Sequence, residues 1–324
     1  MPGRRAVLLG ALAAPMLPRG AWAQADWVPD RPLRLVVPSG PGGSQDVLGR
    51  LFAQAVAPEL GQQVLVENRA GAGGLVGAEV VADATPDGTV LLLATAGQLT
   101  IPKALGRRLP YDPVEGFAPV IHLVDSPVVL LAAPNLEVTD ARELLELART
   151  TYIPLPYAST GIGTNTHLIM EDLKERAGLN VEHVPYRGAA AAYNDLLAGR
   201  IALMFVSMSS MLGISGGAPK VLAVTSRTRF PAAPDIPTLI EAGVPDFEAS
   251  IWTGLCAPAG TPAPILARLA EAFGTALRSP TIQERLADLG AVGNGGDGRA
   301  FAAMLRADLE RWSRVAAPLH TQLN

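Results

Sequence analysis

Residues 33–48, LRLVVPSGPGGSQDVL, contain the pattern that decides the fold. A short apolar run ends at Pro38, a glycine-rich stretch follows, and apolar side chains then recur at helical spacing. The pattern predicts a strand, a tight turn and a helix. Such a turn exposes unpaired backbone N–H groups at the positive end of the helix dipole, and these groups attract an anion.

A second stretch later in the chain has the same order. Residues 155–158 predict a strand, residues 159–164, STGIGT, a glycine-rich turn, and residues 165–177 a helix. Either turn alone could equally be a plain connection between a strand and a helix. Two such turns with hydroxyl side chains between the glycines favour a binding site, in which the turns face each other across a cleft.

Strands and helices alternate along the rest of the chain, which predicts two α/β units with mainly parallel sheets flanked by helices. Thr139 is the expected N-cap of one of these helices. The Pro-rich residues 231–245 are expected to lead back to the first unit. The further strands are predicted at 33–37, 64–66, 90–94, 128–133, 181–184, 201–206 and 221–225, and the further helices at 75–84, 140–150, 189–198, 262–278 and 298–316.

The composition excludes several classes of protein. With 324 residues, 49% of them hydrophobic and 17% charged, the chain is neither disordered nor, with one cysteine, a disulfide scaffold. The net charge of −4 gives no basic field, so we expect no nucleic-acid partner. The mean hydropathy is positive, but no apolar run reaches the ~18 residues of a membrane span. Cys256 has apolar neighbours and is expected in the core.

The first residues predict an export signal. Arg4 and Arg5 precede an apolar stretch, and residues 21–23, AWA, place small side chains where signal peptidase cleaves, before Gln24. Two prolines in this region argue against a buried helix. The arginine pair permits the twin-arginine route as well as the general secretory route. Removing residues 1–23 would leave 23 basic and 30 acidic residues, a net charge of −7.

Catalytic and metal-binding interpretations find little support. The dinucleotide pattern G-x-G-x-x-G lacks its last glycine at each near match. Residues 213–217, GISGG, match a nucleophile-elbow string around Ser215, but a strand-like segment follows instead of a helix. The histidines lack metal-ligand spacing, and His167 is expected on a helix face with a satisfied ring. Glu171 and Asp172 are interpreted as solvated helix charges. We predict no catalytic residue, no cofactor and no metal.

Seven blocks of sequence, in order along essentially the whole mature chain, carry a family resemblance. They are PLRLVVPSGPGGSQD (32–46), VENRAGAGG (66–74), PDG (86–88), HVPYRG (183–188), DLLAG (195–199), IPTLIEAG (236–243) and WTGL (252–255) with APAGTP (257–262). The chain resembles the solute-binding proteins of tripartite tricarboxylate transporters, also called the Bug family. The resemblance implies a two-lobed type II periplasmic binding protein fold, with residues 24–125 and 245–324 in lobe I and residues 126–244 in lobe II.

The resemblance also implies a carboxylate ligand between the two glycine-rich turns, in agreement with the anion argument. Asp46 is expected to orient its loop, because two carboxylates repel each other. Ser39 stands where the family commonly has an aromatic residue, which leaves the ligand size open. Arg187 either frames the cleft or is a solvated surface charge. The expected ligand-binding residues are Ser39, Gly40, Gly42, Gly43, Asp46, Thr95, Gly97, Ser126, Ser159, Thr160, Gly163, Thr164, Tyr186 and Ser207.

These observations predict a monomeric periplasmic protein that binds a small organic carboxylate. The resemblance implies that it delivers this ligand to the membrane permease subunits of a tripartite tricarboxylate transporter. Two alternatives stay open. The same fold could report to a sensor protein instead of a permease, and a secreted hydrolase could use Ser215 and His167.

Overall fold

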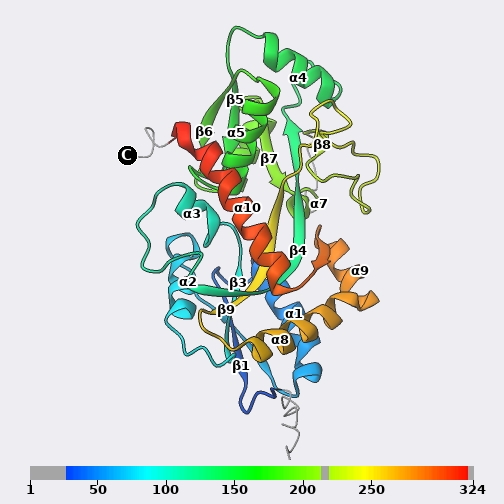
Figure 1. The fold of residues 1–324 in the computed structure, drawn as a ribbon. Helices are drawn as coiled ribbons and strands as arrows, with labels where there is room; N and C mark the ends of the chain where they lie inside the picture. The colour runs from blue at the N-terminus through cyan, green and yellow to red at the C-terminus, as the bar shows by residue number, and fades with distance from the viewer. Residues whose placement is uncertain (1–26, 213–218, 320–324) are drawn as a thin grey trace, which may run out of the picture.

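A computed structural model describes residues 27–212 and 219–319 of the chain. The expected export signal and Ser215 lie outside these residues. Within them, no helix combines the length and the apolar character that crossing a membrane requires. The described residues form two stacked α/β lobes that share one mixed sheet (Figure 1).

The first lobe holds one end of the sheet between two layers of helices. Its strands are β1 (Leu33–Val37), β2 (Val64–Asn68), β3 (Val90–Ala94), β9 (Ser250–Pro258) and β10 (Val292–Gly295). Its helices are α1 (Ser44–Leu60), α2 (Leu75–Ala82), α3 (Thr100–Ala104), α8 (Ala263–Arg278) and α9 (Pro280–Asp288), together with the short 3-10 turn η1 (Ala72–Gly74). β1 pairs in parallel with β2 and β3. All five residues of β3 are buried, as expected for a strand covered on both faces.

The second lobe repeats this arrangement with its own parallel strands. β5 pairs in parallel with β6 and β7, while β8 lies at the other edge. Its strands are β5 (Leu155–Ser159), β6 (Val181–Pro185), β7 (Leu203–Ser207) and β8 (Lys220–Val224). Its helices are α4 (Ala141–Thr150), α5 (Asn165–Ala177), α6 (Ala189–Leu197) and α7 (Met208–Leu212).

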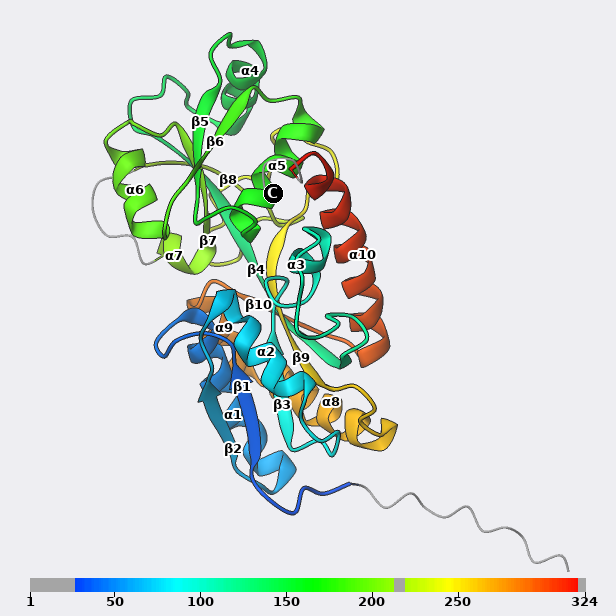
Figure 2. The same ribbon diagram turned by 90° about the vertical axis from the view of Figure 1, so that its left-hand side faces the viewer.

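One long strand, β4 (Phe117–Ala132), runs through both lobes. Its first part pairs antiparallel with β9 and β10, and its last part pairs antiparallel with β7 and β8. The sequence predicted a strand at 128–133 only. The first part contains Pro119 and two register shifts against β9, and it becomes a strand by pairing with a segment far away in the chain. β4 and β9 are therefore the strands that join the lobes (Figure 2).

Helix α10 (Gly298–Ala316) packs along both lobes on one side of these joining strands (Figure 2). Its bounds equal those predicted from the sequence. Near its start, Phe301 packs so tightly on β9 that a Cβ at Gly254 would lie 2.1 Å from the Phe301 ring. The 3-10 turn η2 (Ala317–Leu319) follows it directly. The helix thus connects the joining strands of the first lobe to the second lobe.

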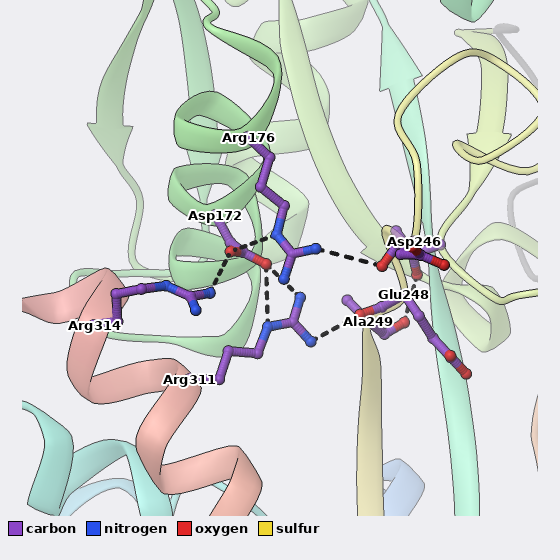
Figure 3. A network of polar contacts seen from close by, with 8 residues as sticks. Asp172, Arg176, Asp246, Glu248, Ala249, Arg311 and Arg314 are labelled. Atoms are coloured by element: carbon purple, nitrogen blue, oxygen red, sulfur yellow. Dashed lines mark hydrogen bonds and ion pairs between the residues drawn. The ribbon is translucent and has the colours of Figure 1, made fainter.

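A buried carboxylate ties the end of α10 to α5 (Figure 3). Asp172 is fully buried, and it forms ion pairs with Arg176 on its own helix (3.0 Å) and with Arg311 and Arg314 on α10. Arg311 also donates to the backbone oxygen of Glu248 (2.7 Å), just before β9. The expectation of a solvated charge at Asp172 is therefore wrong. Helical spacing shows that the residue is on a helix, but not that a second helix covers it.

Two smaller expectations have clear outcomes. Cys256 is a free, fully buried cysteine in the core, as expected. The N-cap of α4 is Asp140, whose side chain accepts from Glu143 N, and not Thr139. Thr139 instead donates through N and Oγ1 to the Glu143 carboxylate, so the two residues still close the same helix start.

The division into residues 24–125 with 245–324 and residues 126–244 stays a prediction as far as its boundaries are concerned. The fold class itself is confirmed by the two lobes and their flanking helices. The outer strands of each lobe are parallel, whereas the joining strands run antiparallel to their neighbours.

Candidate functional site

A buried carboxylate holds the turn between β1 and α1. Asp46 accepts hydrogen bonds from the backbone N–H of Gly42 (2.9 Å) and from Arg50 Nε (3.1 Å). A third bond comes from Asn68 Nδ2 (3.0 Å), which also donates to the backbone oxygen of Ser39. These bonds, first of all that from Arg50, lower the pKa of Asp46 to about 2. Asp46 therefore orients the turn, which is the role expected from its charge.

Two further loops pack against this turn. Thr95 N and Oγ1 both donate to Gln98 Oε1, and Gln98 Nε2 donates to the backbone oxygen of Gly73. A Cβ at Gly74 would lie 2.5 Å from Gln98 Nε2 and 2.8 Å from the backbone oxygen of Pro38, so only glycine fits there. The loops that follow β1, β2 and β3 therefore form one packed edge at the carboxyl ends of these parallel strands.

Hydroxyl groups hold the second-lobe turn in shape. Ser159 Oγ lies 2.7 Å from His183 Nε2 and accepts a hydrogen bond from Gly161 N (3.1 Å). Thr164 Oγ1 donates to the backbone oxygen of Gly161 (2.8 Å). Both hydroxyls are therefore engaged inside the turn, and what the turn offers outward is its backbone.

His167 lies directly beneath this turn. Its Nδ1 accepts a hydrogen bond from Gly163 N (3.1 Å), and its ring stacks on His183 with 3.8 Å between the centroids. Burial, above all, lowers the pKa of His167 to about 3, so the ring is neutral at pH 7. Because Nδ1 accepts, we assign the proton to Nε2, which has no hydrogen-bond partner among the described residues. The expected satisfied ring is thus correct for one nitrogen only.

This histidine makes stability depend on pH. Its pKa is lower in the folded chain than the ordinary value near 6.5, so below pH 6.5 the unfolded chain binds a proton that the folded chain does not. We expect the free energy of unfolding to fall by roughly 2 kcal/mol between pH 7 and pH 5. The pKa of His183 is also lowered by burial and acts in the same direction.

Urea unfolding at pH 8, 7, 6 and 5 tests this expectation. The His167→Asn variant places an amide oxygen near the position of Nδ1, so it keeps an acceptor for Gly163 N but cannot titrate, and most of the loss below pH 7 should disappear. Asp46 adds little in this range, because its lowered pKa acts only below about pH 4. An equally large loss in the variant would contradict the assignment.

Neither helix that follows a glycine-rich turn has a side-chain cap. α1 begins after Gly43 and α5 begins after Thr164, and neither residue caps its helix through a side-chain hydrogen bond, whereas Asp140 does so for α4. Within the described ranges, the backbone N–H groups of residues 44–46 and 165–167 have no acceptor. These groups are available to an anion at the positive ends of two helix dipoles.

Three side-chain atoms beside the two turns are buried without a hydrogen-bond partner among the described residues. They are Ser39 Oγ, Gln45 Nε2 and Asn165 Nδ2. A buried donor that stays unpaired costs about 1–3 kcal/mol, so such atoms indicate where a ligand or water completes the bonding. Sequence reasoning selected Ser39 but missed Gln45 and Asn165. Their position in the first turn of a helix, just after a glycine-rich turn, is the signal that could have identified them.

The lobes also touch each other away from the joining strands. A Cβ at Gly163 would lie 2.6 Å from Leu105 Cδ1, which follows α3 in the first lobe. A Cβ at Gly290, between α9 and β10, would lie 2.5 Å from the backbone nitrogen of Ser209 in α7. We call these two places the closing contacts. At both places the two lobes are in direct contact, and the sequence held no signal for these contacts.

The predicted site residues fall into two groups, one on each lobe. The Tyr186 hydroxyl donates to Asp195 (2.6 Å), and burial together with Asp195 raises its pKa to about 12, so this side chain faces α6. Tyr186 contacts the turn through its backbone N–H, which donates to Ser159 O. The first-lobe group is Ser39, Gly40, Gly42, Gly43, Asp46, Thr95 and Gly97, and the second-lobe group is Ser159, Thr160, Gly163, Thr164, Tyr186 and Ser207, with Ser126 on β4.

Other kinds of site find less support in the structure. No group of three or more His, Cys, Asp or Glu side chains in residues 27–212 and 219–319 is arranged to hold a metal ion. His167, the base of the hydrolase alternative, is buried in the second lobe and engaged with Gly163. Arg187 is exposed, and its side chain forms no ion pair with a described residue.

A match to a known protein family identifies the chain. The model of the tripartite tricarboxylate transporter family receptor matches residues 48–320. The chain belongs to this receptor family. One relative of this chain is the UPF0065 protein in the tcbD-tcbE intergenic region of Pseudomonas sp. strain P51. The two are 36% identical over 99% of this chain and 96% of that protein.

Solved structures of similar proteins have the same fold. The periplasmic binding protein BugD is 36% identical, with a TM-score of 0.72 over 90% of this chain and 98% of that one. Rpa4515 of R. palustris with adipate is 33% identical, with a TM-score of 0.74 over 89% and 97%. MatC of Rhodopseudomonas palustris with bound malate is 33% identical, with a TM-score of 0.73 over 89% and 99%. The chain is therefore a solute-binding receptor with the two-lobed fold of the Bug proteins.

Proposed function

We propose that this receptor binds a small organic carboxylate between its lobes and delivers it to the permease subunits of a tripartite tricarboxylate transporter. The observation that carries the proposal is the pair of uncapped helix starts, α1 and α5, each behind a glycine-rich turn on a facing lobe. Their free N–H groups suit the oxygens of a carboxylate at each end of a small molecule. The adipate and malate in the two similar structures support this class of ligand.

The carboxylate acts by binding the closed arrangement better than the open one. In this proposal, donors from both lobes meet a common ligand when the lobes close. Gln45 Nε2 and Asn165 Nδ2, which are buried without a hydrogen-bond partner among the described residues, are two such donors. The difference in affinity shifts the population toward the closed form. A permease that recognises the closed form then receives loaded receptor only.

Three further features belong to this proposal. The protein is exported, with cleavage before Gln24, and works in the periplasm as a monomer. Its mature charge of −7 provides no long-range attraction for an anion. Capture of the ligand then depends on the local dipoles of α1 and α5.

Calorimetric titration with adipate, malate and a tricarboxylate such as citrate tests the proposal. We expect at least one of them to bind, and to raise the melting temperature by mass action. The Asn165→Ala variant should weaken this binding about tenfold, the effect of one hydrogen bond to a charged group.

Asn194→Ala is the matched control, because Asn194 is exposed on α6 of the same lobe. It should leave the affinity unchanged. If no mono-, di- or tricarboxylate binds the mature protein, the proposed function is wrong.

A further inference from the structure

An arginine of the first lobe lies against the glycine-rich turn of the second lobe. Next to the contact with Leu105, a Cβ at Gly163 would lie 3.3 Å from Arg107 Nη2. Gly163 stands two positions before Asn165, the first residue of α5. Arg107 follows α3 in the chain, and both views show α3 at the end of the first lobe nearest α5 (Figure 1 and Figure 2). A guanidinium from one lobe therefore reaches the turn that precedes a helix of the other lobe.

The backbone around this arginine is held by hydrogen bonds to α3. Arg107 N donates to the backbone oxygen of Pro102 (3.0 Å). Gly106 N donates to that of Lys103 (3.0 Å), and its φ of +64° ends the helix. Leu105, just before it, is buried. The place of Arg107 is therefore set by the end of α3, and its exposed side chain is open to a ligand from solvent.

The Arg107 guanidinium has no counter-charge within the part of the chain that the structure describes. It forms neither a hydrogen bond nor an ion pair with a described residue. Other cations close to the two turns are paired. Arg50 lies 3.0 Å from the buried Asp46 at the first-lobe turn, and Lys174 on α5 lies 3.5 Å from Glu171. The positive charge of Arg107 is therefore available to an anion, whereas that of Arg50 is already compensated.

The start of α5 adds donors but no full charge. The backbone N–H groups of residues 165–167 and the buried Asn165 Nδ2 have no acceptor among the described residues. His167 is neutral at pH 7, because burial lowers its pKa to about 3. A guanidinium beside the positive end of a helix dipole is unfavourable unless an anion compensates both. An ionised carboxylate does so, whereas a neutral amide or hydroxyl group pairs with the donors and leaves the two positive charges uncompensated.

We propose that Arg107 is a specificity-determining residue, which makes the second-lobe end of the carboxylate site select an ionised carboxylate over a neutral amide. This inference rests on the proposed function and adds that the two ends of the site differ. At the first-lobe end, Ser39 Oγ and Gln45 Nε2 are neutral, so that end discriminates less by charge. Hydrogen bonds between ionised groups are roughly twice as strong as those between neutral groups. The ligand therefore needs a carboxylate at the α5 end, and carries a carboxylate or a neutral polar group at the other.

Acetate and acetamide, which have nearly the same shape and differ in charge, test this selectivity. Backbone amide NMR signals of the isotope-labelled mature protein report on each turn separately. We expect acetate to shift the signals of residues 163–167 with at least fivefold higher affinity than acetamide. Arg107→Gln should weaken acetate binding at these residues about tenfold, because the charged partner is lost. The response of residues 43–46 to acetate should be the same in the wild type and the variant.

Arg108→Gln is the matched control, because it removes the same charge from the neighbouring exposed side chain. It should change the acetate affinity less than twofold, and Arg107→Lys, which keeps the charge, should restore part of the affinity that Arg107→Gln loses.

Two results would overturn the inference. If Arg107→Gln binds acetate at residues 163–167 as tightly as the wild type, Arg107 does not contact the ligand. If acetamide binds there as tightly as acetate, the turn does not select for charge. The proposed function has a separate readout in the titrations with adipate, malate and citrate. If one of them binds and Arg107→Gln changes nothing, only this inference fails. If acetate binding depends on Arg107 but none of the three binds, only the proposed function fails.

Discussion

The Gly290→Ala variant should bind its carboxylate at least tenfold more weakly than the wild type while keeping both lobes folded. The new Cβ would lie 2.5 Å from Ser209 N and 2.8 Å from the backbone carbon of Met208, and neither backbone atom can move aside as a flexible side chain could. One closing contact must therefore open. Ligand binding then has to supply the energy that forces the lobes together, and the affinity falls accordingly.

A second glycine provides the matched control for this variant. Gly290 and Gly61 have the same left-handed backbone, with φ of +66° at each, but nothing lies within 4 Å of a Cβ at Gly61. Gly61→Ala carries the same backbone strain of about 1 kcal/mol and should leave the affinity unchanged. Calorimetric titration of both variants measures the difference. Equal affinities would show that the lobes close without the contact at Gly290.

The Asp172→Asn variant should lose about 3 kcal/mol of stability, which corresponds to a fall of roughly 6–9 °C in melting temperature. The substitution keeps the shape of the side chain but leaves Arg176, Arg311 and Arg314 without the carboxylate that joins them. Arg311 also stacks over the Trp312 ring at 4.8 Å and cannot turn to solvent without losing that contact. Because parts of the three arginine side chains are exposed to solvent, we expect a loss of stability at the lower end of the range for a broken buried ion pair.

Glu175→Gln is the control for this prediction, since Glu175 is exposed on the same helix and forms no ion pair with a described residue. It should change the melting temperature by less than about 2 °C. Thermal unfolding followed by circular dichroism gives both values. If Asp172→Asn melts at the same temperature as Glu175→Gln, the cluster does not fasten α10 to the second lobe.

Local sequence patterns were sufficient to predict the bounds of several strands and helices. β1, β3, α5 and α10 have the predicted bounds. Each is a continuous apolar or amphipathic segment, so its local preference agrees with the fold. The predicted turns lie at the starts of α1 and α5 for the same reason, and Asp46 orients its loop through neighbours that the sequence already placed nearby.

The missed elements depend on distant partners. β9 and the first part of β4 contain glycine or proline and become strands because they pair with each other, with Phe117 opposite Pro258. The helices α3, α7 and α9 and the strand β10 were also not predicted. In such segments the local sequence pattern does not distinguish a strand or helix from a loop. Pairing with distant residues decides which of them forms.

The sequence by itself determined the α/β class, the two glycine-rich turns and their anion-attracting helix starts, because these follow from periodicity and from backbone geometry within a few residues. Only the tertiary structure decided which donors stay unpaired, where the lobes touch at Gly163 and Gly290, and that Asp172 is a buried anchor and not a solvated charge. Burial and contact are properties of residues that meet across the fold. Arg311 reaches Asp172 from 139 positions away, and no local pattern contains that information.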